Sequence, residues 1–381
     1  MNLPVYLDYN ATTPVAPEVA DAIIPYLREH FGNPSSAHVF GQRAKLAVAQ
    51  ARAQVAALIN ARADEIVFTG SATEANNLAL LGVARAFGRP AHLIISAVEH
   101  PAIAAPTKQL EDAGWNVTIV PVDGYGRVAP EDVRQALRSD TALVSIMHAN
   151  NEIGTMQPVT EITALVKAHG ALMHTDAAQS AGKVPLDVSA LGVDLLTLAG
   201  HKFYATKGVG ALYVRSGTLI APILTGGEQE RGLRPGTENV PAIVGLGEAA
   251  RLARERLPVA EPRLKALRDR LHEKLQEAIP QLQLNGHPEH CLPNTLHVSF
   301  PGVAGRELLD RCAAEVAASL GSACHAESDA VSGVLAALGQ GAARALGAVR
   351  LSVGWMTSEA EIERAAAALV AAFADCHAKK P

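Results

Sequence analysis

The stretches Leu172-Met-His-Thr-Asp-Ala-Ala-Gln179 and Leu195-Leu-Thr-Leu-Ala-Gly-His-Lys202 decide the fold. Each begins as an apolar run typical of a buried strand and leads to a side chain capable of chemistry, Asp176 or Lys202. A lysine amine can form a Schiff base with a carbonyl cofactor, and a carboxylate can keep a pyridine nitrogen protonated. The pair therefore indicates a pyridoxal phosphate enzyme. The alternative is that Asp176 caps a helix and Lys202 is a solvated surface lysine.

Similar β-branched runs recur from about Glu65 to Val214, with amphipathic segments between them. This alternation predicts an α/β fold with a mostly parallel sheet flanked by helices. Ligands of such sheets bind at the carboxyl ends of the strands, where Asp176 and Lys202 are expected. The expected strands cover residues 66–69, 93–96, 117–120, 143–147, 172–174 and 195–198, and the expected helices cover 75–87, 103–113 and 159–169.

The pattern changes after Val214. A glycine-rich loop over 225–237 precedes a long Ala/Leu/Arg/Glu stretch from Pro241 to about Ala278, and strands near 295–300 and 348–353 precede a closing helix from Ser358. We place a domain boundary near Leu257-Pro258. Residues 15–258 are then a large cofactor-binding α/β domain, and residues 1–14 and 259–381 are a small α+β domain.

Composition excludes several classes of function. The 381 residues, 49% hydrophobic and 19% charged with a net charge of -5, are typical of a globular protein without a basic surface for nucleic acid. The amino terminus does not resemble a secretory signal, and no apolar run approaches the roughly 20 residues of a membrane span. We therefore expect a cytoplasmic protein that binds neither membranes nor nucleic acid.

The cysteines and histidines predict no metal site. The four cysteines, at 291, 312, 324 and 376, have no paired spacing, so neither a disulfide framework nor a zinc site is indicated. The cluster His287-Pro-Glu-His-Cys291 lies in a Pro/Gly loop and does not have the helical spacing of a zinc motif. Cys312 falls on an apolar face and is most simply a core residue.

Several other residues are candidates for a cofactor site. The segment 69–75 joins a strand to a helix, where backbone N–H groups favour a phosphate, although a Ser or Thr there is often only an N-cap. His201 can donate to the same phosphate. His100 follows a strand and can lie against a cofactor ring, whereas Gln179 and Asn151 can hydrogen-bond the cofactor. The alternatives are a polar loop histidine and ordinary turn residues.

Arg350 and Cys324 are candidates for work on the substrate. Arg350 lies in a strand-like run, and a buried arginine needs an anion, either a substrate carboxylate or a structural ion-pair partner. Asn33 can assist a carboxylate clamp. Cys324 lies in a small, polar stretch typical of a mobile loop, and its thiol becomes nucleophilic if a neighbour such as His325 lowers its pKa. The alternative is an inert loop cysteine.

The chain resembles the NifS/IscS-type cysteine desulfurases, which are fold-type I pyridoxal phosphate enzymes of the class V aminotransferase group. The resemblance covers nearly the whole chain and implies a seven-stranded sheet. It also implies that L-cysteine is converted to L-alanine, with sulfur passing as a persulfide to an acceptor such as an iron–sulfur scaffold protein or a thiolation pathway. The matching stretches are 6–14, 32–38, 72–74, 99–100, 150–154, 176–179, 200–202, 236–237 and 321–324.

The resemblance implies a role for each candidate. Lys202 is implied as the Schiff-base lysine, Asp176 as the partner of the pyridine nitrogen, His100 as the stacking residue, Gln179 and Asn151 as further cofactor contacts, and Ala72, Thr73 and His201 as phosphate ligands. Thr237 is implied to reach the phosphate from the second subunit of a homodimer, Asn33 and Arg350 to hold the substrate carboxylate, and Cys324 to form the persulfide.

The chain also departs from the family pattern. Ala199 stands where many relatives carry serine, which predicts weaker cofactor retention. The segment from Cys324 to Val334 has the length of the long-loop group, but 321–325 and 234–239 look closer to selenocysteine lyases. Selenocysteine lyase is therefore the alternative activity. A transaminase would not explain Cys324, and a non-catalytic scaffold that docks sulfur carriers would not explain the retention of both Lys202 and Cys324.

Overall fold

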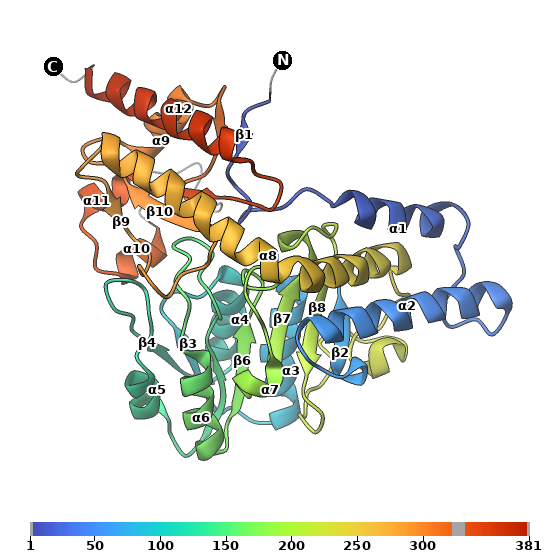
Figure 1. Cartoon of the computed structure of the whole chain (residues 1–381). Coiled ribbons are helices and arrows are strands. Elements are labelled where there is room, and N and C mark those ends of the chain that lie inside the picture. Colours follow the sequence, from blue (N-terminus) through green and yellow to red (C-terminus); the bar gives the residue numbers. More distant parts are fainter. Residues whose placement is uncertain (1–2, 322–331, 379–381) are drawn as a thin grey trace.

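A seven-stranded sheet forms the centre of the computed structural model, which describes residues 3–321 and 332–378 (Figure 1). Its strand order is β2-β8-β7-β6-β5-β3-β4; β8 is antiparallel to both neighbours and the other pairs are parallel. The predicted mostly parallel α/β fold is confirmed. The strands are β2 Ile66–Thr69, β3 His92–Ser96, β4 Asn116–Val120, β5 Thr141–Ser145, β6 Leu172–Asp176, β7 Leu195–Ala199 and β8 Gly210–Val214.

Helices cover both faces of this sheet, which explains why its strands are continuous apolar runs. Side chains alternate across a strand, so Leu93 and Ile95 pack with α3 and α4 on one face, while Ile94 packs with the helices on the other. The first layer is α3 Ala72–Phe87 and α4 Pro101–Asp112; the second contains α1 Pro17–Arg28, α2 Val39–Leu58, α6 Val159–His169 and the first part of α8 Val240–Ala278.

A second, smaller core lies beyond the carboxyl ends of the large sheet. There an antiparallel three-stranded sheet has the order β12-β10-β9, and β1 pairs in parallel with β11. The predicted strands near 295–300 and 348–353 and the closing helix are confirmed. The elements are β1 Val5–Tyr6, β9 Gln283–Leu284, β10 Thr295–Ser299, β11 Val316–Ala317, β12 Ala348–Ser352, α9 Gly305–Arg311 and α12 Glu359–Ala378, and the remaining short helices are α5 Pro130–Ala136, α7 Val188–Leu191, α10 Gly333–Ala337 and α11 Ala342–Leu346.

Helix α8 connects the two cores and passes through the expected domain boundary. It continues across Pro258 and Pro262 without a break (Figure 1). Its buried residues from Ala242 to Ala253 belong to the large core, whereas those from Leu264 to Leu275 belong to the second core. A division at residue 258 thus falls between the two parts of α8, and the domain assignment stays a prediction.

The helices of the described part of the chain include none that is long and apolar enough to cross a membrane.

Candidate active site

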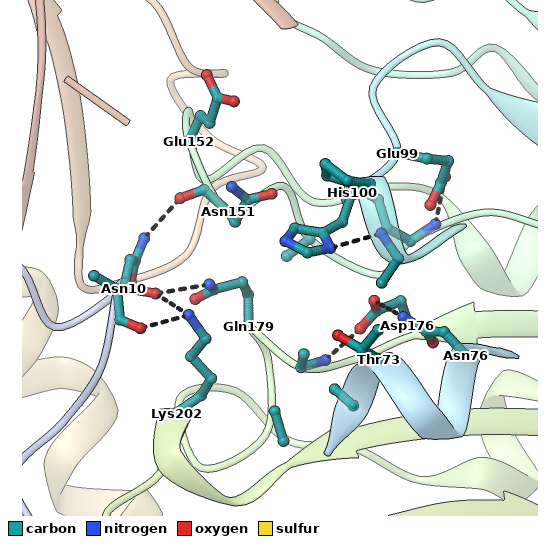
Figure 2. A pocket seen from close by; sticks show the side chains of 18 of the residues that line it. Asn10, Thr73, Asn76, Glu99, His100, Asn151, Glu152, Asp176, Gln179 and Lys202 are labelled. Carbon is teal, nitrogen blue, oxygen red and sulfur yellow. Dashed lines mark hydrogen bonds between the residues drawn. The ribbon is translucent and has the colours of Figure 1, made fainter. Parts of the chain in front are cut away.

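A cavity of about 430 Å³ opens at the carboxyl ends of β6 and β7, as expected for a sheet of this topology. The amino-terminal turns of α3 and α4 form part of its wall. Figure 2 shows Lys202 and Asp176 on opposite sides of the cavity, with His100 on a third side. The predicted residues that line it are Ala72, Thr73, His100, Asn151, Asp176, Gln179, His201, Lys202 and Arg350.

Lys202 presents a free amine that is already held by the main chain. Strand β7 ends at Ala199, and a single 3₁₀ turn, Gly200–Lys202, carries the lysine to the cavity. Its Nζ donates to the carbonyl oxygens of Asn10 at 2.5 Å and Ala11 at 2.8 Å. Burial, followed by the charge of Arg350, lowers the pKa of Lys202 to about 8. A substantial share of the amine is therefore neutral near physiological pH, as a nucleophile or base must be.

Asp176 is the last residue of β6 and is buried. Its Oδ2 accepts from Nδ2 of Asn76 at 2.6 Å, and its Oδ1 accepts from the backbone N–H of Ala178 at 2.9 Å. These donors fix the carboxylate in one orientation. The other amide atom of Asn76, Oδ1, is buried without a hydrogen-bond partner in the described structure. A buried polar site with spare acceptor capacity is suited to a ligand that brings a donor.

The first turn of α3 forms a second polar wall. Ser71 caps the helix by accepting from the N–H of Glu74, and Ala72 and Thr73 face the cavity. Gly210 on β8 permits this approach, because a Cβ there would lie 2.7 Å from the carbonyl carbon of Ser71 and 2.9 Å from the nitrogen of Ala72. The 16-residue helix concentrates N–H groups and a positive dipole end at this wall, which favours an anion.

His201 lies beside that wall. Its Nδ1 is 3.2 Å from the hydroxyl of Thr12. Burial and then the charge of Lys202 lower the pKa of His201 to about 4, so the ring is neutral and can donate from one nitrogen only.

His100 and Glu99 form the wall contributed by the turn before α4. His100 caps α4 by accepting from the N–H of Ala102 at 3.0 Å, which fixes its ring at the cavity (Figure 2). Burial lowers the pKa of His100, so the ring is held neutral. Glu99 accepts from Ser96 at 2.6 Å and from the N–H of Met147 at 2.9 Å, and burial raises its pKa to about 8.

Asn10 links the amide residues of the cavity. Its carbonyl oxygen accepts from Nε2 of Gln179 at 3.0 Å as well as from Lys202, and its Nδ2 donates to the carbonyl of Asn151 at 3.3 Å (Figure 2). Gln179 thus forms a structural hydrogen bond and also lines the cavity.

Arg350 has the structural ion-pair partner that was the alternative explanation for it. Its Nη2 lies 2.7 Å from Oδ1 of Asp8, and its Nη1 donates to the carbonyls of Asn151 and Gly321, each at 2.9 Å. Its Nε is buried and, in the described structure, has no hydrogen-bond partner. Arg350 therefore has a structural role, and its side chain also lines the cavity.

Three predicted residues are not in this lining. Asn33 and Thr237 are exposed and lie outside it, and Cys324 belongs to residues 322–331, outside the described part of the chain. The residues on either side of that segment are informative, because Gly321 and Gly333 both line the cavity. Gly321 precedes Cys324 by three residues in the sequence.

Sequence reasoning assigned no role to Asn10, Asn76 or Glu152, which also line the cavity. Asn76 carried a usable signal, because it lies three and four residues after Thr73 and Ala72 and so faces the same side of α3. Asn10 lies in the stretch 6–14, which matches the family, but the match implied no role for it. The described residues include no cluster of His, Cys, Asp or Glu able to hold a metal ion.

Comparison with known proteins finds relatives that match nearly the whole chain. The family model for Aminotransferase class-V matches residues 5–365. Cysteine desulfurase IscS of Dictyoglomus turgidum is 45% identical over 364 residues, which cover 95% of this chain and 92% of the relative. A solved structure named NifS-like protein has a TM-score of 0.92 at 38% identity, covering 98% of this chain and 100% of the other. Another, described as SspA in complex with cysteine, has a TM-score of 0.82 at 37% identity, covering 91% of this chain and 98% of the other.

Proposed function

The chain belongs to the aminotransferase class-V family, and from that premise we propose that it converts L-cysteine to L-alanine while Cys324 takes up the substrate sulfur. The chain is a pyridoxal phosphate enzyme of the cysteine desulfurase class. The observation that carries the assignment of residues is that one cavity is lined by Lys202, Asp176 and two glycines, Gly321 and Gly333, that lie before and after the segment containing Cys324 in the sequence.

The cavity fits pyridoxal phosphate. The amino terminus of α3, with Ala72, Thr73 and nearby His201, offers donors for a phosphate. Asp176 offers a fixed carboxylate for a protonated ring nitrogen, and Lys202 offers the amine for an aldehyde. When bound, the cofactor acts as an electron sink for a carbanion at the substrate Cα.

Lys202 is proposed as the base that removes the substrate Cα proton. Its Nζ has a pKa of about 8 and a carbonyl pair, Asn10 and Ala11, that can hold it once it is protonated. Arg350, which lines the cavity, and Asn33 are proposed to hold the substrate carboxylate. His100, Gln179 and Asn151 are proposed to position the cofactor.

The sulfur transfer balances without an added oxidant. The Cys324 thiolate attacks the sulfur of the substrate, a sulfur–sulfur bond forms, and the carbon–sulfur bond breaks with its electron pair going to Cβ. Protonation of the carbon product gives alanine, and the enzyme retains a persulfide on Cys324. The position of Gly321 supports this assignment, because Gly321 lines the cavity and precedes Cys324 by three residues in the sequence.

We extend the proposal to the oligomeric state, the sulfur acceptor and the cellular location. Large apolar side chains are exposed on α1, α2 and the segment between them, namely Leu27, Phe31, Val39, Phe40 and Leu46, which we call the α1–α2 apolar patch. Exposed apolar groups in such number favour an interface. We propose a homodimer in which Thr237 reaches the partner's phosphate site, an acceptor protein such as an iron–sulfur scaffold that takes the persulfide sulfur, and a cytoplasmic location.

Alanine release tests the activity. Wild type, Lys202→Ala and Cys324→Ala are incubated with L-cysteine and, separately, with L-selenocysteine at matched concentrations. We expect Lys202→Ala to lack the visible absorbance of the bound cofactor and all turnover, and Cys324→Ala to bind the cofactor but release no alanine from L-cysteine. Undiminished alanine release from L-cysteine by Cys324→Ala would refute the role of the thiol. If wild type and Cys324→Ala both released alanine preferentially from L-selenocysteine, that result would favour selenocysteine lyase.

A further inference from the structure

Lys183 is a buried lysine that the proposed reaction leaves without a role. It follows β6, and only 6% of its surface is exposed. Its Nζ donates to two neutral amide oxygens, Oε1 of Gln179 at 2.8 Å and Oδ1 of Asn10 at 3.0 Å. Amide oxygens do not neutralise an ammonium, and burial together with the charges of Lys202 and Arg350 holds the pKa of Lys183 well below its usual value. Burying an amine in this environment costs free energy, which suggests that its hydrogen bonds have a role.

Both amides that Lys183 binds lead to Lys202. Gln179 turns its oxygen toward Lys183 and its Nε2 toward the carbonyl of Asn10, at 3.0 Å. That same carbonyl accepts from the amine of Lys202 at 2.5 Å (Figure 2). The side-chain oxygen of Asn10 is shared between Lys183 and Nδ2 of Asn294, each at 3.0 Å. Gln179 thus links Lys183 to the Asn10 carbonyl, which accepts from the amine of Lys202.

We propose that Lys183 is a positioning residue that acts through Gln179 and Asn10 to hold the carbonyl groups of Asn10 and Ala11 where they receive the free amine of Lys202. Peptide carbonyls only accept, so a well-placed pair stabilises the ammonium of Lys202 against the loss of its proton. Lys183 in this way sets the pH at which Lys202 becomes a nucleophile. The inference rests on the proposed function, because it takes Lys202 as the lysine that bonds the cofactor.

The sign of one measurement separates this role from the alternatives. Lys183→Met keeps the length of the side chain but removes the donor, so Gln179 and Asn10 lose a shared anchor and the carbonyl pair is held less firmly. The ammonium of Lys202 then loses acceptors and its pKa falls. If Lys183 instead acted as a nearby positive charge, its removal would raise the pKa of Lys202. A purely structural lysine would change thermal stability and leave the pKa of Lys202 unchanged.

The test follows the rate at which the full chain, freed of cofactor, gains visible absorbance on addition of pyridoxal phosphate, as a function of pH. We expect a wild-type midpoint near the pKa of about 8 of Lys202. Lys183→Met should lower the midpoint by about half a pH unit or more, roughly a threefold change in the neutral fraction. Lys183→Gln should recover part of the shift, because its amide N–H groups can donate. Lys108→Met, a change at an exposed lysine on α4, should leave the midpoint unchanged.

An unchanged or higher midpoint in Lys183→Met would overturn the inference, as would equal shifts in Lys183→Met and Lys183→Gln. If Lys183→Met does not fold, Lys183→Leu removes the same donor with a shorter side chain and should also lower the midpoint; an unchanged midpoint there would likewise overturn it. Lys202→Ala separates the two proposals. Absorbance that survives in Lys202→Ala defeats the proposed function, whereas absorbance that requires Lys202 but has the same midpoint in wild type and Lys183→Met defeats only this inference.

Discussion

Single residues at the cavity are tuned by burial more than by ion pairs. Lys202, His201, His100 and Glu99 all have pKa values shifted first by desolvation, and in each case the shift favours the neutral form. The exception is Arg350, which keeps its ion pair with Asp8. An anionic cofactor or substrate that enters the cavity therefore meets neutral histidines, the protonated fraction of Lys202 and the guanidinium of Arg350.

Glu99 gives a pH-dependent prediction. Burial raises the pKa of Glu99 from 4.5 to about 8, so the folded state keeps a proton that the unfolded chain releases. The stability that this proton confers is complete below pH 4.5 and is lost as the pH rises through about 8. Glu99→Gln stays neutral, so its melting temperature relative to wild type should rise across this range by about 2 °C or more.

The control for this prediction is Glu273→Gln, a change at an exposed glutamate of α8. Melting temperatures of both variants and of wild type are measured at a series of pH values, with cofactor bound. We expect a constant difference from wild type for Glu273→Gln. A constant difference for Glu99→Gln as well would show that the Glu99 carboxyl ionises normally in the folded protein.

Ala199 gives a prediction about cofactor retention. It lies at the end of β7 in the cavity wall, directly before the turn that carries His201 and Lys202. A hydroxyl at this position can donate to a charged phosphate, which is worth about 1.5–3 kcal/mol. Ala199→Ser should therefore lower the Kd for pyridoxal phosphate about tenfold, measured by absorbance titration. Ala199→Cys is the matched variant with a weaker donor, and an equal Kd for Ala199→Ser and wild type would contradict the account.

The residues themselves could be predicted where strand ends and helix starts locate them, as for Asp176, Lys202 and Thr73. The partners of these residues could not. Asn10 contacts Lys183 and Lys202 across more than 170 positions of sequence. No local pattern reports such a contact, because it depends on how the amino-terminal segment crosses the sheet.

At the scale of elements, the loop that carries Thr237 is fastened to the strand before the phosphate wall. Arg52 on α2 forms an ion pair with Glu230 at 2.6 Å, and Glu230 also accepts from the N–H of Phe68 on β2 at 2.9 Å. Glu230 and Arg231 have φ values of 48° and 58°, a left-handed conformation that costs non-glycine residues about 1–3 kcal/mol each. The ion pair with Arg52 and the hydrogen bond from Phe68 hold the Glu230 side chain where this backbone conformation places it.

Removing one partner of this pair tests its contribution. Arg52→Met leaves the carboxylate of Glu230 buried and unpaired, which should lower the free energy of unfolding by about 3 kcal/mol or more. Urea denaturation followed by tryptophan fluorescence measures the change. Arg134→Met removes an exposed ion pair with Glu131 and should have no measurable effect. A similarly small effect for Arg52→Met would contradict the role assigned to the ion pair.

Element prediction succeeded where length and periodicity were strong. The helix from Val159 to His169 has the predicted bounds, and the long helix α8 covers the Ala/Leu/Arg/Glu-rich stretch that begins at Pro241. The two-residue strands β1, β9 and β11 were not predicted, because two residues carry no periodicity. Their pairing depends on the fold around them.

At the scale of the whole molecule, the α1–α2 apolar patch predicts self-association. Phe31 and Phe40 stack with ring centroids 5.6 Å apart, so two side chains of the patch pack against each other within the single chain. Leu46→Glu introduces a charge into the patch and should shift the protein from dimer to monomer, measured by size exclusion with light scattering. Ile119→Glu alters an exposed residue of the edge strand β4 and should leave the dimer intact. A dimer that persists in Leu46→Glu would place the interface elsewhere.

The order of strands and helices in the sequence was enough to predict the α/β architecture. The chemistry was predicted from the resemblance of the motifs to those of a known family. It did not predict that α8 would be one helix shared by two cores. That outcome depends on packing along the 39 residues of α8, whose two prolines are accommodated within the helix.

The central claim is that Cys324 receives the sulfur of L-cysteine at the cavity built around Lys202 and Asp176. Mass spectrometry of the Cys324 peptide after one turnover, with thiols alkylated, tests it most directly. The account predicts a mass gain of one sulfur atom on Cys324, matched by an equal amount of alanine and absent from Lys202→Ala. Alanine formed in that amount with no added sulfur on Cys324, or with the sulfur on another cysteine, would contradict it.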